Sequence, residues 1–168
     1  SKRMGEELCD FYIRKFGLKI IIIRPFNHIG PGQSADFAIS SFAKQIAMIE
    51  KKLQPNEIKV GDLSPSRDFT DVRDIINGYR MLAESELDSG IFNICSGIPV
   101  KIEDALKALL KLSKEKIKVV QDKEKMRPSD IQVYYGSYKK LQKAIGWKPE
   151  IPFEKTLVDI LNYWRERV

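Results

Sequence analysis

A glycine-rich stretch that follows an apolar run is the first part of this sequence with the residue types and spacing of a binding loop. Residues 20–35 read IIIIRPFNHIGPGQSA, and the tail GPGQSA fits the pattern G-x-G-x-x-G/A. In a dinucleotide-binding loop such glycines directly follow a strand and let the N-terminus of a helix approach a pyrophosphate. Here residues 24–29 separate the apolar run from Gly30, and Glu50, which has the spacing of the usual ribose-binding acid, falls inside a helical pattern. We therefore interpret Gly30–Gly32 as a turn rather than a phosphate-binding loop.

The polar residues ahead of those glycines are better candidates for chemistry. Arg24-Pro25-Phe26-Asn27-His28 comes directly after the apolar run, and α/β sheets bind ligands at the carboxyl ends of their strands. Asn27 is a ligand contact or, alternatively, a residue that forms an Asx turn. His28, the only histidine, is interpreted as a loop-packing or substrate-side residue and not as a general base.

The surrounding elements alternate between helix and strand, which predicts an α/β fold. Apolar residues have helical spacing over 2–16, and Gly17 is a natural stop; residues 18–24 form a β-branched run typical of a parallel strand buried on both faces. Further helices are predicted at 35–52, 71–85, 101–113, 136–147 and 152–167. Asp71 caps the second of these, Gly146 ends the fourth and Pro152 begins the fifth. Strands or extended segments are predicted at 57–62, 66–70, 90–97 and 116–121. Little else is apolar enough to form a second buried parallel strand. We therefore expect the chain to be the C-terminal part of a larger α/β protein.

Composition narrows the class of protein. The 168 residues are 43% hydrophobic and 31% charged, as in a globular domain or part of one. No run approaches the ~18–20 apolar residues of a membrane span and the N-terminus is not a signal peptide, so we expect a cytoplasmic protein without a membrane partner. Cys9 and Cys95 lie far apart and outside any C-x-x-C, which favours buried free thiols. One histidine and two cysteines also argue against a metal site.

The net charge of +6 raises the question of nucleic-acid binding. The basic residues are spread, however, and the densest run, 111–127, interleaves Glu and Asp; there is no RNP-like aromatic pattern and no zinc knuckle. A solvated basic face, able to attract an anionic small substrate, is the favoured interpretation, and no nucleic-acid partner is expected.

A series of segments, in order, carries a resemblance. SK at 1–2 followed by GEEL, then IIIIRPFNHIGPGQ, SRDFTDVRDI, GIFNICSG and RPSD, resembles the second half of extended short-chain dehydrogenases/reductases, the NAD-dependent epimerase/dehydratase family, which act on nucleotide sugars. Within it, NHIGPGQ, FAKQI, VGDLSPSRDFTDVRDI and NICSG most resemble GDP-4-keto-6-deoxy-mannose reductases, with GDP-mannose 4,6-dehydratases next. The resemblance spans essentially the whole chain. It implies that 1–34 are the last helix and strand units of an NAD(P)-binding Rossmann domain. It also implies that 35–168 are mainly a small α/β substrate-binding subdomain, with some segments returning to the Rossmann sheet.

The resemblance also implies roles near the cofactor. Lys2 matches the lysine of the catalytic Tyr-x-x-x-Lys pair, where an ammonium lowers the tyrosine pKa and binds the nicotinamide ribose; taken alone, Lys2 would be an ordinary exposed lysine. The tyrosine would precede Ser1 by three residues, and the glycine-rich cofactor motif would also lie outside these residues, so we expect 1–168 alone to be inactive. Pro25 and Phe26 would pass the nicotinamide of NAD or NADP, and Asn27 would hydrogen-bond the sugar-phosphate portion of the substrate.

Two arginines match family positions that hold the substrate diphosphate. They are Arg67 in SRDFTD and Arg127 in RPSD, and guanidinium groups bind phosphates through short, charge-assisted bonds. The alternative for each is a surface ion pair. Asp68 and Asp71 are expected to orient Arg67 and cap the next helix rather than to touch ligand.

The implied activity is reduction of a GDP-4-keto-6-deoxy-hexose. Dehydratases usually carry a basic pair on the helix after the glycine loop; here Ser40 and Ser41 stand there and Lys44 comes later, which favours the reductase. A dehydratase or 4-epimerase, and a non-catalytic nucleotide-sensing or RNA-binding member of the fold, remain as alternatives. The family also pairs helices at the position of 2–16, so a homodimer through this helix is expected.

Overall fold

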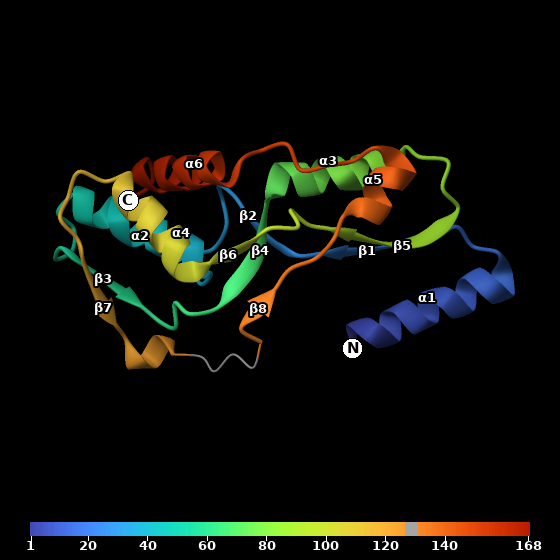
Figure 1. Ribbon diagram of the computed structural model, residues 1–168, viewed down its shortest axis with the longest axis horizontal. Coiled ribbons are helices and arrows are strands. Elements are labelled where there is room, and N and C mark those ends of the chain that lie inside the picture. The colour runs from blue at the N-terminus through green and yellow to red at the C-terminus, as the bar shows by residue number, and fades with distance from the viewer. Residues whose placement is uncertain (127–130) are drawn as a thin grey trace.

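The computed structural model describes residues 1–126 and 131–168 as an elongated molecule of helices and short strands (Figure 1). The helices are α1 (Lys2–Phe16), α2 (Ala38–Glu50), α3 (Val72–Ala83), α4 (Ile102–Lys111), α5 (Lys139–Ile145) and α6 (Phe153–Arg165), with a 3-10 turn at Lys123–Lys125. The strands are β1 (Ile20–Pro25), β2 (Asn27–Ile29), β3 (Glu57–Val60), β4 (Ser66–Asp71), β5 (Ser89–Ile94), β6 (Pro99–Lys101), β7 (Lys118–Gln121) and β8 (Val133–Tyr134). This alternation confirms the predicted α/β class.

The chain changes its strand partner at Phe26. β1 pairs in parallel with β5, from Ile20 opposite Ser89 to Pro25 opposite Ile94. The N–H of Phe26 still donates to the carbonyl of Ile94 (3.0 Å), but one residue later β2 pairs in parallel with β4. We call this point, where the chain leaves β5 and joins β4, the fork.

The parallel pairing of β1 with β5 is a feature that the sequence does not predict. Residues 90–97 were predicted as a strand but not as the parallel neighbour of the apolar run. In β5 only Phe92 and Ile94 are buried, while Ile91 is 39% exposed, so the strand alternates between faces instead of showing a continuous apolar run. β1 itself is half-buried, not covered on both faces, within the described residues.

Strand β4 is the centre of a second sheet. It pairs with β2, with β6 in antiparallel fashion and with β8 in parallel, while β3 and β7 form a separate parallel pair. Helices α2, α4 and α6 gather at the same end of the molecule (Figure 1). Their apolar faces build the larger core with Ile58, Val60 and Phe69.

A smaller core packs around Trp147 at the other end, where α3 and α5 lie beside β5 (Figure 1). The indole N–H of Trp147 donates to the carbonyl of Asp74 (3.1 Å). A Cβ on Gly78 would lie 2.8 Å from Ile94 Cδ1 and 3.0 Å from the indole nitrogen, so only glycine lets α3 approach the indole this closely. Because α3, α5 and β5 pack with β1, several later segments share a core with the first strand. The division at residue 34 stays a prediction.

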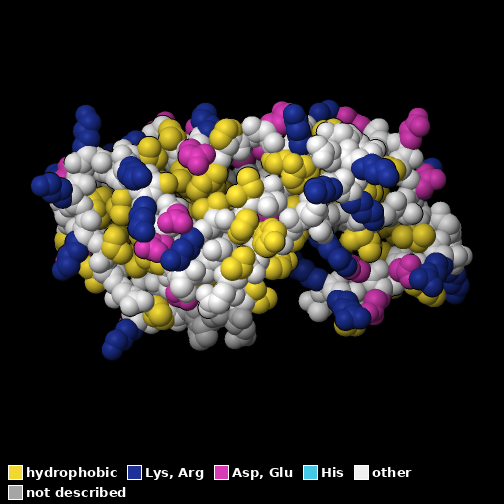
Figure 2. All heavy atoms as spheres, viewed as in Figure 1, with side chains coloured by type: hydrophobic (Ala, Val, Ile, Leu, Met, Phe, Trp, Pro, Cys, Tyr) yellow, Lys and Arg dark blue, Asp and Glu magenta, His cyan; other side chains and the backbone are white. Residues whose placement is uncertain are grey.

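Helix α1 is only loosely packed against the rest of the molecule. None of its residues is buried, and Figure 2 shows open space between it and the middle of the molecule. Arg24 at the end of β1 forms a two-pronged ion pair with Glu6 of α1, in which Nε lies 2.7 Å from Oε1. Met4, Leu8, Phe11 and Phe16 on this helix are all about half exposed or more.

The helix boundaries predicted from capping residues are confirmed. Gly17 and Gly146 adopt left-handed backbone conformations after α1 and α5, and the Asp71 carboxylate caps α3. Helix α2 begins at Ala38, three residues later than predicted. None of the helices in the described part of the chain is long and apolar enough to cross a bilayer.

Candidate functional site

A hollow of about 450 Å³ lies at the carboxyl end of β1. Its lining brings together Pro25, Phe26, Asn27 and His28 on one side and Arg67 of β4 on the other. The remaining lining residues are Ile29, Gln33, Phe37, Ala38, Ile39, Phe69, Ile102 and Tyr134. We call it the strand-end hollow. It contains all of the predicted cofactor- and substrate-binding residues except Lys2 and Arg127.

The fork explains why these residues converge. A strand that changes its pairing partner leaves a crevice between the two sheets at that point. The ligands of α/β proteins bind in such crevices, at the carboxyl ends of the strands. Phe26 is the residue at the switch, and Asn27 and His28 are the first two residues of the new pairing. The backbone topology therefore delivers Asn27 and His28 to the edge of the hollow.

The polar side chains of the hollow differ in how they are held. The Gln33 amide donates to the carbonyl of His28 (2.9 Å), and His28 Nδ1 lies 3.2 Å from the carbonyl oxygen of Phe26. The Asn27 side chain makes no hydrogen bond within residues 1–126 and 131–168 and is exposed. The Asx turn considered as its alternative role is therefore not observed.

Arg67 projects from β4 as a half-buried cation in the wall of the hollow. Its Nη1 donates to the carbonyl of Ser66 (2.8 Å) and lies 3.5 Å from that of Gln132. Both of these contacts are with backbone carbonyls, and a guanidinium group is a side chain that binds phosphates through short, charge-assisted bonds.

The two aspartates beside Arg67 have different roles. Asp71 caps α3, as predicted: its Oδ1 accepts the N–H of Arg73 (2.8 Å). The expectation that Asp68 orients Arg67 is wrong. Successive residues of a strand point to opposite faces, and the carboxylate of Asp68 is buried against Ser96, Gly97 and Gly136.

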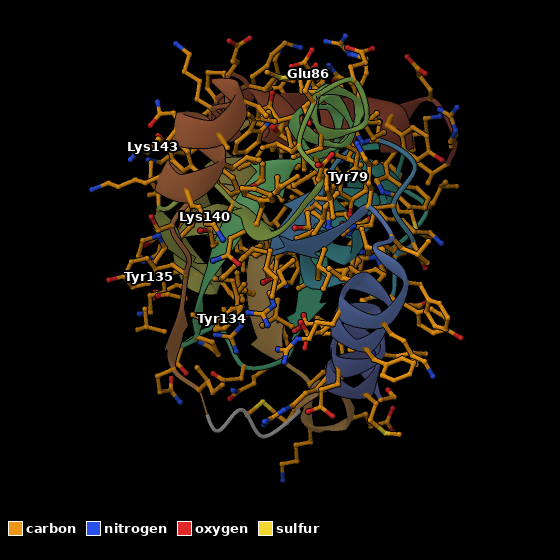
Figure 3. All side chains as sticks on the ribbon, turned by 90° about the vertical axis from the view of Figure 1, so that its right-hand side faces the viewer. Tyr79, Glu86, Tyr134, Tyr135, Lys140 and Lys143 are labelled. Atoms are coloured by element: carbon orange, nitrogen blue, oxygen red, sulfur yellow. The ribbon has the colours of Figure 1, made fainter. Side chains whose placement is uncertain are left out.

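Tyr134 is a wall residue that the sequence did not reveal. Its ring stacks on that of Phe26, with centroids 4.8 Å apart and planes 18° apart. Figure 3 shows Tyr134 toward the centre of the view, while Tyr135 lies toward the outer edge. The clustered aromatics in QVYYG were the available signal, but β8 has two residues and shows no periodicity.

Two predicted residues are not placed in the hollow. Lys2 is exposed in the first turn of α1 and does not line it. Arg127, with Pro128 and Asp130, lies outside the described residues. The roles assigned to Lys2 and Arg127 stay predictions.

The glycines of the GPGQSA stretch have structural roles. A Cβ on Gly30 would lie 2.6 Å from Val72 Cγ1, and Gly32 has a φ of 91°. The N–H of Gln33 closes a turn on the carbonyl of Gly30 (3.3 Å). Helix α2 starts six residues after Gly32, so its N-terminus does not form the phosphate-binding geometry of the dinucleotide motif.

A second hollow of about 550 Å³ shares Phe37, Ala38 and Ile102 with the first, so the two are contiguous. We call it the outer hollow. Its charged lining residues have both signs: Asp36, Lys59, Asp62, Glu124 and Lys125. Sequence reasoning missed this region because its residues come from four separate segments.

Ser40 and Ser41, which stand at the positions of the dehydratase basic pair, lie in two different environments. Ser40 is buried, accepts the indole N–H of Trp164 (3.0 Å) and donates to the carbonyl of Gln33 (2.7 Å). Ser41 lines the outer hollow. Lys44 lies over the Trp164 ring, 5.2 Å from its centroid.

Both cysteines are free thiols, as predicted. Cys95 is fully buried; burial, together with the charge of Asp68, raises its pKa to about 12. Cys9 is only half-buried. Within the described residues no group of three His, Cys, Asp or Glu side chains could hold a metal ion.

The parallel strands, the partner switch at Phe26 and the hollow at the strand ends fit a Rossmann-type α/β protein. Similarity to known proteins assigns this fold to the epimerase/dehydratase class of short-chain dehydrogenases/reductases. The family model for GDP-mannose 4,6 dehydratase matches residues 1–160, and the chain belongs to this family.

Similar proteins of known structure or activity agree with this assignment. The chain is 40% identical over 169 residues to the GDP-6-deoxy-D-mannose reductase of Pseudomonas aeruginosa, covering 100% of this chain and 55% of that protein. The structure of RMD from Pseudomonas aeruginosa complexed with NADPH matches with a TM-score of 0.90 and 39% identity, over 97% of this chain and 54% of that one. The UDP-glucuronic acid 4-epimerase of Bacillus cereus, in complex with UDP-glucuronic acid and NAD, matches with a TM-score of 0.79 and 25% identity, over 96% and 50%. The chain thus spans about half the length of the curated relatives it matches.

Proposed function

We propose that these residues form the nucleotide-sugar-binding part of an NAD(P)-dependent reductase that converts a GDP-4-keto-6-deoxy-hexose to a GDP-6-deoxy-hexose. The observation that carries the proposal is the strand-end hollow, where Asn27, His28 and the cation of Arg67 meet at a switch point. The identity to a GDP-6-deoxy-D-mannose reductase supports the choice of reaction.

The two contiguous hollows, of about 450 and 550 Å³, offer space for a nucleoside diphosphate sugar. Arg67 would hold a phosphate through charge-assisted bonds, with Arg127 as its predicted partner. The adjoining outer hollow gives the nucleoside a place to lie, since Phe37 and Ala38 line both spaces. The sugar would then face Asn27 and Phe26.

The cofactor is NADP or NAD, and the residues present are compatible with one side of its site. Pro25, Phe26 and Asn27 line the hollow where the nicotinamide would lie, and Phe26 is held there by its hydrogen bond to Ile94. Lys2 would bind the ribose and lower the pKa of a catalytic tyrosine. When bound, the reduced nicotinamide supplies the hydride for the 4-keto carbon.

The alternatives are a dehydratase or 4-epimerase on the same scaffold, and a protein that binds nucleotides or RNA without catalysis. To separate them, the intact protein is mixed with GDP-4-keto-6-deoxy-mannose or with GDP-mannose while NADPH absorbance is followed. The reductase predicts NADPH consumption only with the keto sugar. No consumption with either substrate contradicts it, and RNA binding without affinity for GDP-sugars would support the non-catalytic alternative.

Arg67 provides the sharpest test of the diphosphate site. Arg67→Gln in the intact protein should raise the KM for the GDP-sugar by about 10- to 100-fold, the range expected for a lost charge-assisted bond. Arg80→Gln on α3 is the matched control, because Arg80 pairs with Glu84 on an exposed helix face and should leave KM unchanged. Equal KM values for both variants would contradict the assignment.

We further propose that the intact protein is a cytoplasmic homodimer held through α1. The support is the row of exposed apolar residues Met4, Leu8, Phe11 and Phe16 on one helix. Leu8→Glu should shift the sedimentation equilibrium toward the monomer, and Glu7→Gln on the same helix should not. A monomeric parent protein would contradict the proposal.

A further inference from the structure

Asp68 is a buried carboxylate that the proposed chemistry does not use. It is 0% exposed, and within the described residues no cation pairs with it. Oδ1 accepts the N–H (2.8 Å) and the hydroxyl (2.7 Å) of Ser96. Oδ2 accepts the N–H groups of Gly97 (2.9 Å) and Gly136 (3.2 Å). A charge withdrawn from water is costly unless donors surround it, and here four donors from two other chain segments do so.

These hydrogen bonds connect the two sides of the fork. Asp68 belongs to β4, which pairs with β2. Ser96 and Gly97 follow the end of β5, which pairs with β1. The carboxylate therefore connects the two sheets between which the chain passes at the fork.

The bond to Gly136 reaches the wall of the strand-end hollow. A Cβ on Gly136 would lie 2.5 Å from Phe26 Cζ and 3.0 Å from Cys95 Sγ. The backbone at Gly136 thus lies against the Phe26 ring, which also stacks on Tyr134. Moving Gly136 would displace Phe26 and, two residues earlier in the chain, Tyr134.

We propose that Asp68 is a positioning residue of the substrate site, which closes the fork and thereby fixes the Phe26–Tyr134 wall opposite Arg67. This inference rests on the proposed function for its effect on the substrate. Its structural part, the fixing of residues 131–138 by the Asp68 charge, does not depend on which substrate binds.

A carboxylate is required because every partner is a donor. Asn at this position keeps the shape but offers one acceptor oxygen, and its NH₂ group would face N–H donors. Asp68→Asn therefore loosens one side of the fork without emptying the core. Serine 96 offers a milder change, since Ser96→Ala removes the hydroxyl donor and leaves the Gly136 bond in place.

The test uses the intact protein with three variants: Asp68→Asn, Gly136→Ala and Ser96→Ala. The first readout is amide hydrogen exchange of peptides covering 131–138, measured without ligand. The second is the dissociation constant of GDP by calorimetry, with KM and kcat for the GDP-sugar. We expect Asp68→Asn to speed exchange in 131–138 and to weaken GDP binding about tenfold or more, with KM raised more than kcat is lowered. Gly136→Ala should weaken GDP binding similarly by displacing Phe26, and Ser96→Ala should stay within about twofold of the parent.

The outcomes separate the two claims. If folded Asp68→Asn keeps the parent exchange rate, GDP affinity and KM, the positioning role is overturned. It is also overturned if Ser96→Ala weakens binding as much as Asp68→Asn does, because a general loss of stability would then explain both. If Asp68→Asn does not fold, Gly136→Ala decides, and parent-like GDP affinity in that variant overturns the proposal. If the parent protein binds no GDP or GDP-sugar, the proposed function fails, while exchange in 131–138 still tests the role of Asp68.

Discussion

Replacing Asp71 tests how the fold joins two of its helices. The Asp71 carboxylate caps α3 through the N–H of Arg73 and receives Nε (2.8 Å) and Nη2 (2.7 Å) of the same arginine. It also accepts the hydroxyl of Thr156 on α6 (2.7 Å). Arg73 in turn reaches Asp159 on α6 (2.8 Å). One buried carboxylate therefore supports the start of α3 and its attachment to α6.

The cost of Asp71→Ala follows from these contacts. Loss of an N-cap costs about 1 kcal/mol. Loss of the bond from the Thr156 hydroxyl costs about 1 kcal/mol, because that hydroxyl keeps a longer contact with the carbonyl of Pro152 (3.3 Å). The pair with Arg73 adds about 0.5 kcal/mol, since that arginine is 46% exposed and solvent screens it. The free energy of unfolding should fall by about 2.5 kcal/mol for Ala, and by about 1 kcal/mol less for Asn, which keeps the cap.

The assay is urea unfolding of the intact protein at neutral pH, with hydrogen exchange to assign the loss to α3 and α6. Asp159→Asn is the matched control, because it removes only the outer contact with Arg73 and Lys155. A loss below about 1 kcal/mol for Asp71→Ala, or equal losses for Ala and Asn, would refute this reasoning.

The same carboxylate predicts a pH dependence. Burial acts to raise the pKa of Asp71, but hydrogen bonds from Arg73 and Thr156 outweigh burial and hold the pKa below its ordinary value of 3.8. A lowered folded-state pKa stabilises the protein above pH 3.8, and this stabilisation is lost as the pH falls through the folded-state value. The stability difference between the parent and Asp71→Asn should therefore be constant from neutral pH to about pH 5 and shrink below pH 3.8.

Three further measurements test other parts of the fold. Glu6→Gln should speed hydrogen exchange in α1, because the ion pair of Glu6 with Arg24 is the main polar link between that helix and β1. The double variant Glu6→Arg, Arg24→Glu should restore slow exchange. If the exchange rate of α1 in Glu6→Gln equals that of the parent protein, this role is contradicted. Cys95 should react with a thiol reagent at neutral pH only on unfolding, since its thiol is buried and has a pKa of about 12; rapid reaction in the folded protein would show that the site is open. Leu109→Ala in the larger core should lower the free energy of unfolding by about 3 kcal/mol in urea titrations. Leu112→Ala, at a 37% exposed position, should lower it by less than about 1 kcal/mol. Similar losses in the two variants would show that Leu109 is not part of the packed core.

Sequence reasoning succeeded where a local signal decides the structure. Asp71 before a helical pattern and Gly146 after one predicted the start of α3 and the end of α5, because capping depends on residues near in the chain. The convergence of Asn27 and Arg67 was predicted from a resemblance spread along the whole chain. That convergence is a property of the topology and not of either segment alone.

Sequence reasoning failed where the structure depends on residues that are far apart in the chain. Strand β8 has two residues, so Tyr134 gave no periodic signal, and only the stacking on Phe26 places it in the wall. Asp68 was assigned to its sequence neighbour Arg67, although the donors that satisfy it are 28 and 68 positions away. Long-range hydrogen bonds of this kind leave no trace in residue spacing.

The alternation along β4 limits how this site can change. Arg67 and Phe69 line the strand-end hollow, while Asp68, between them, is buried against Ser96 and Gly97. A one-residue insertion or deletion in β4 would exchange the two faces, placing an arginine in the interior and a carboxylate in the hollow where we propose that a phosphate binds. Changes to the lining of this hollow are therefore accessible through substitutions at fixed length in β4 or through changes in the loops around it. The length of this strand is as strict a requirement as the identity of any residue in it.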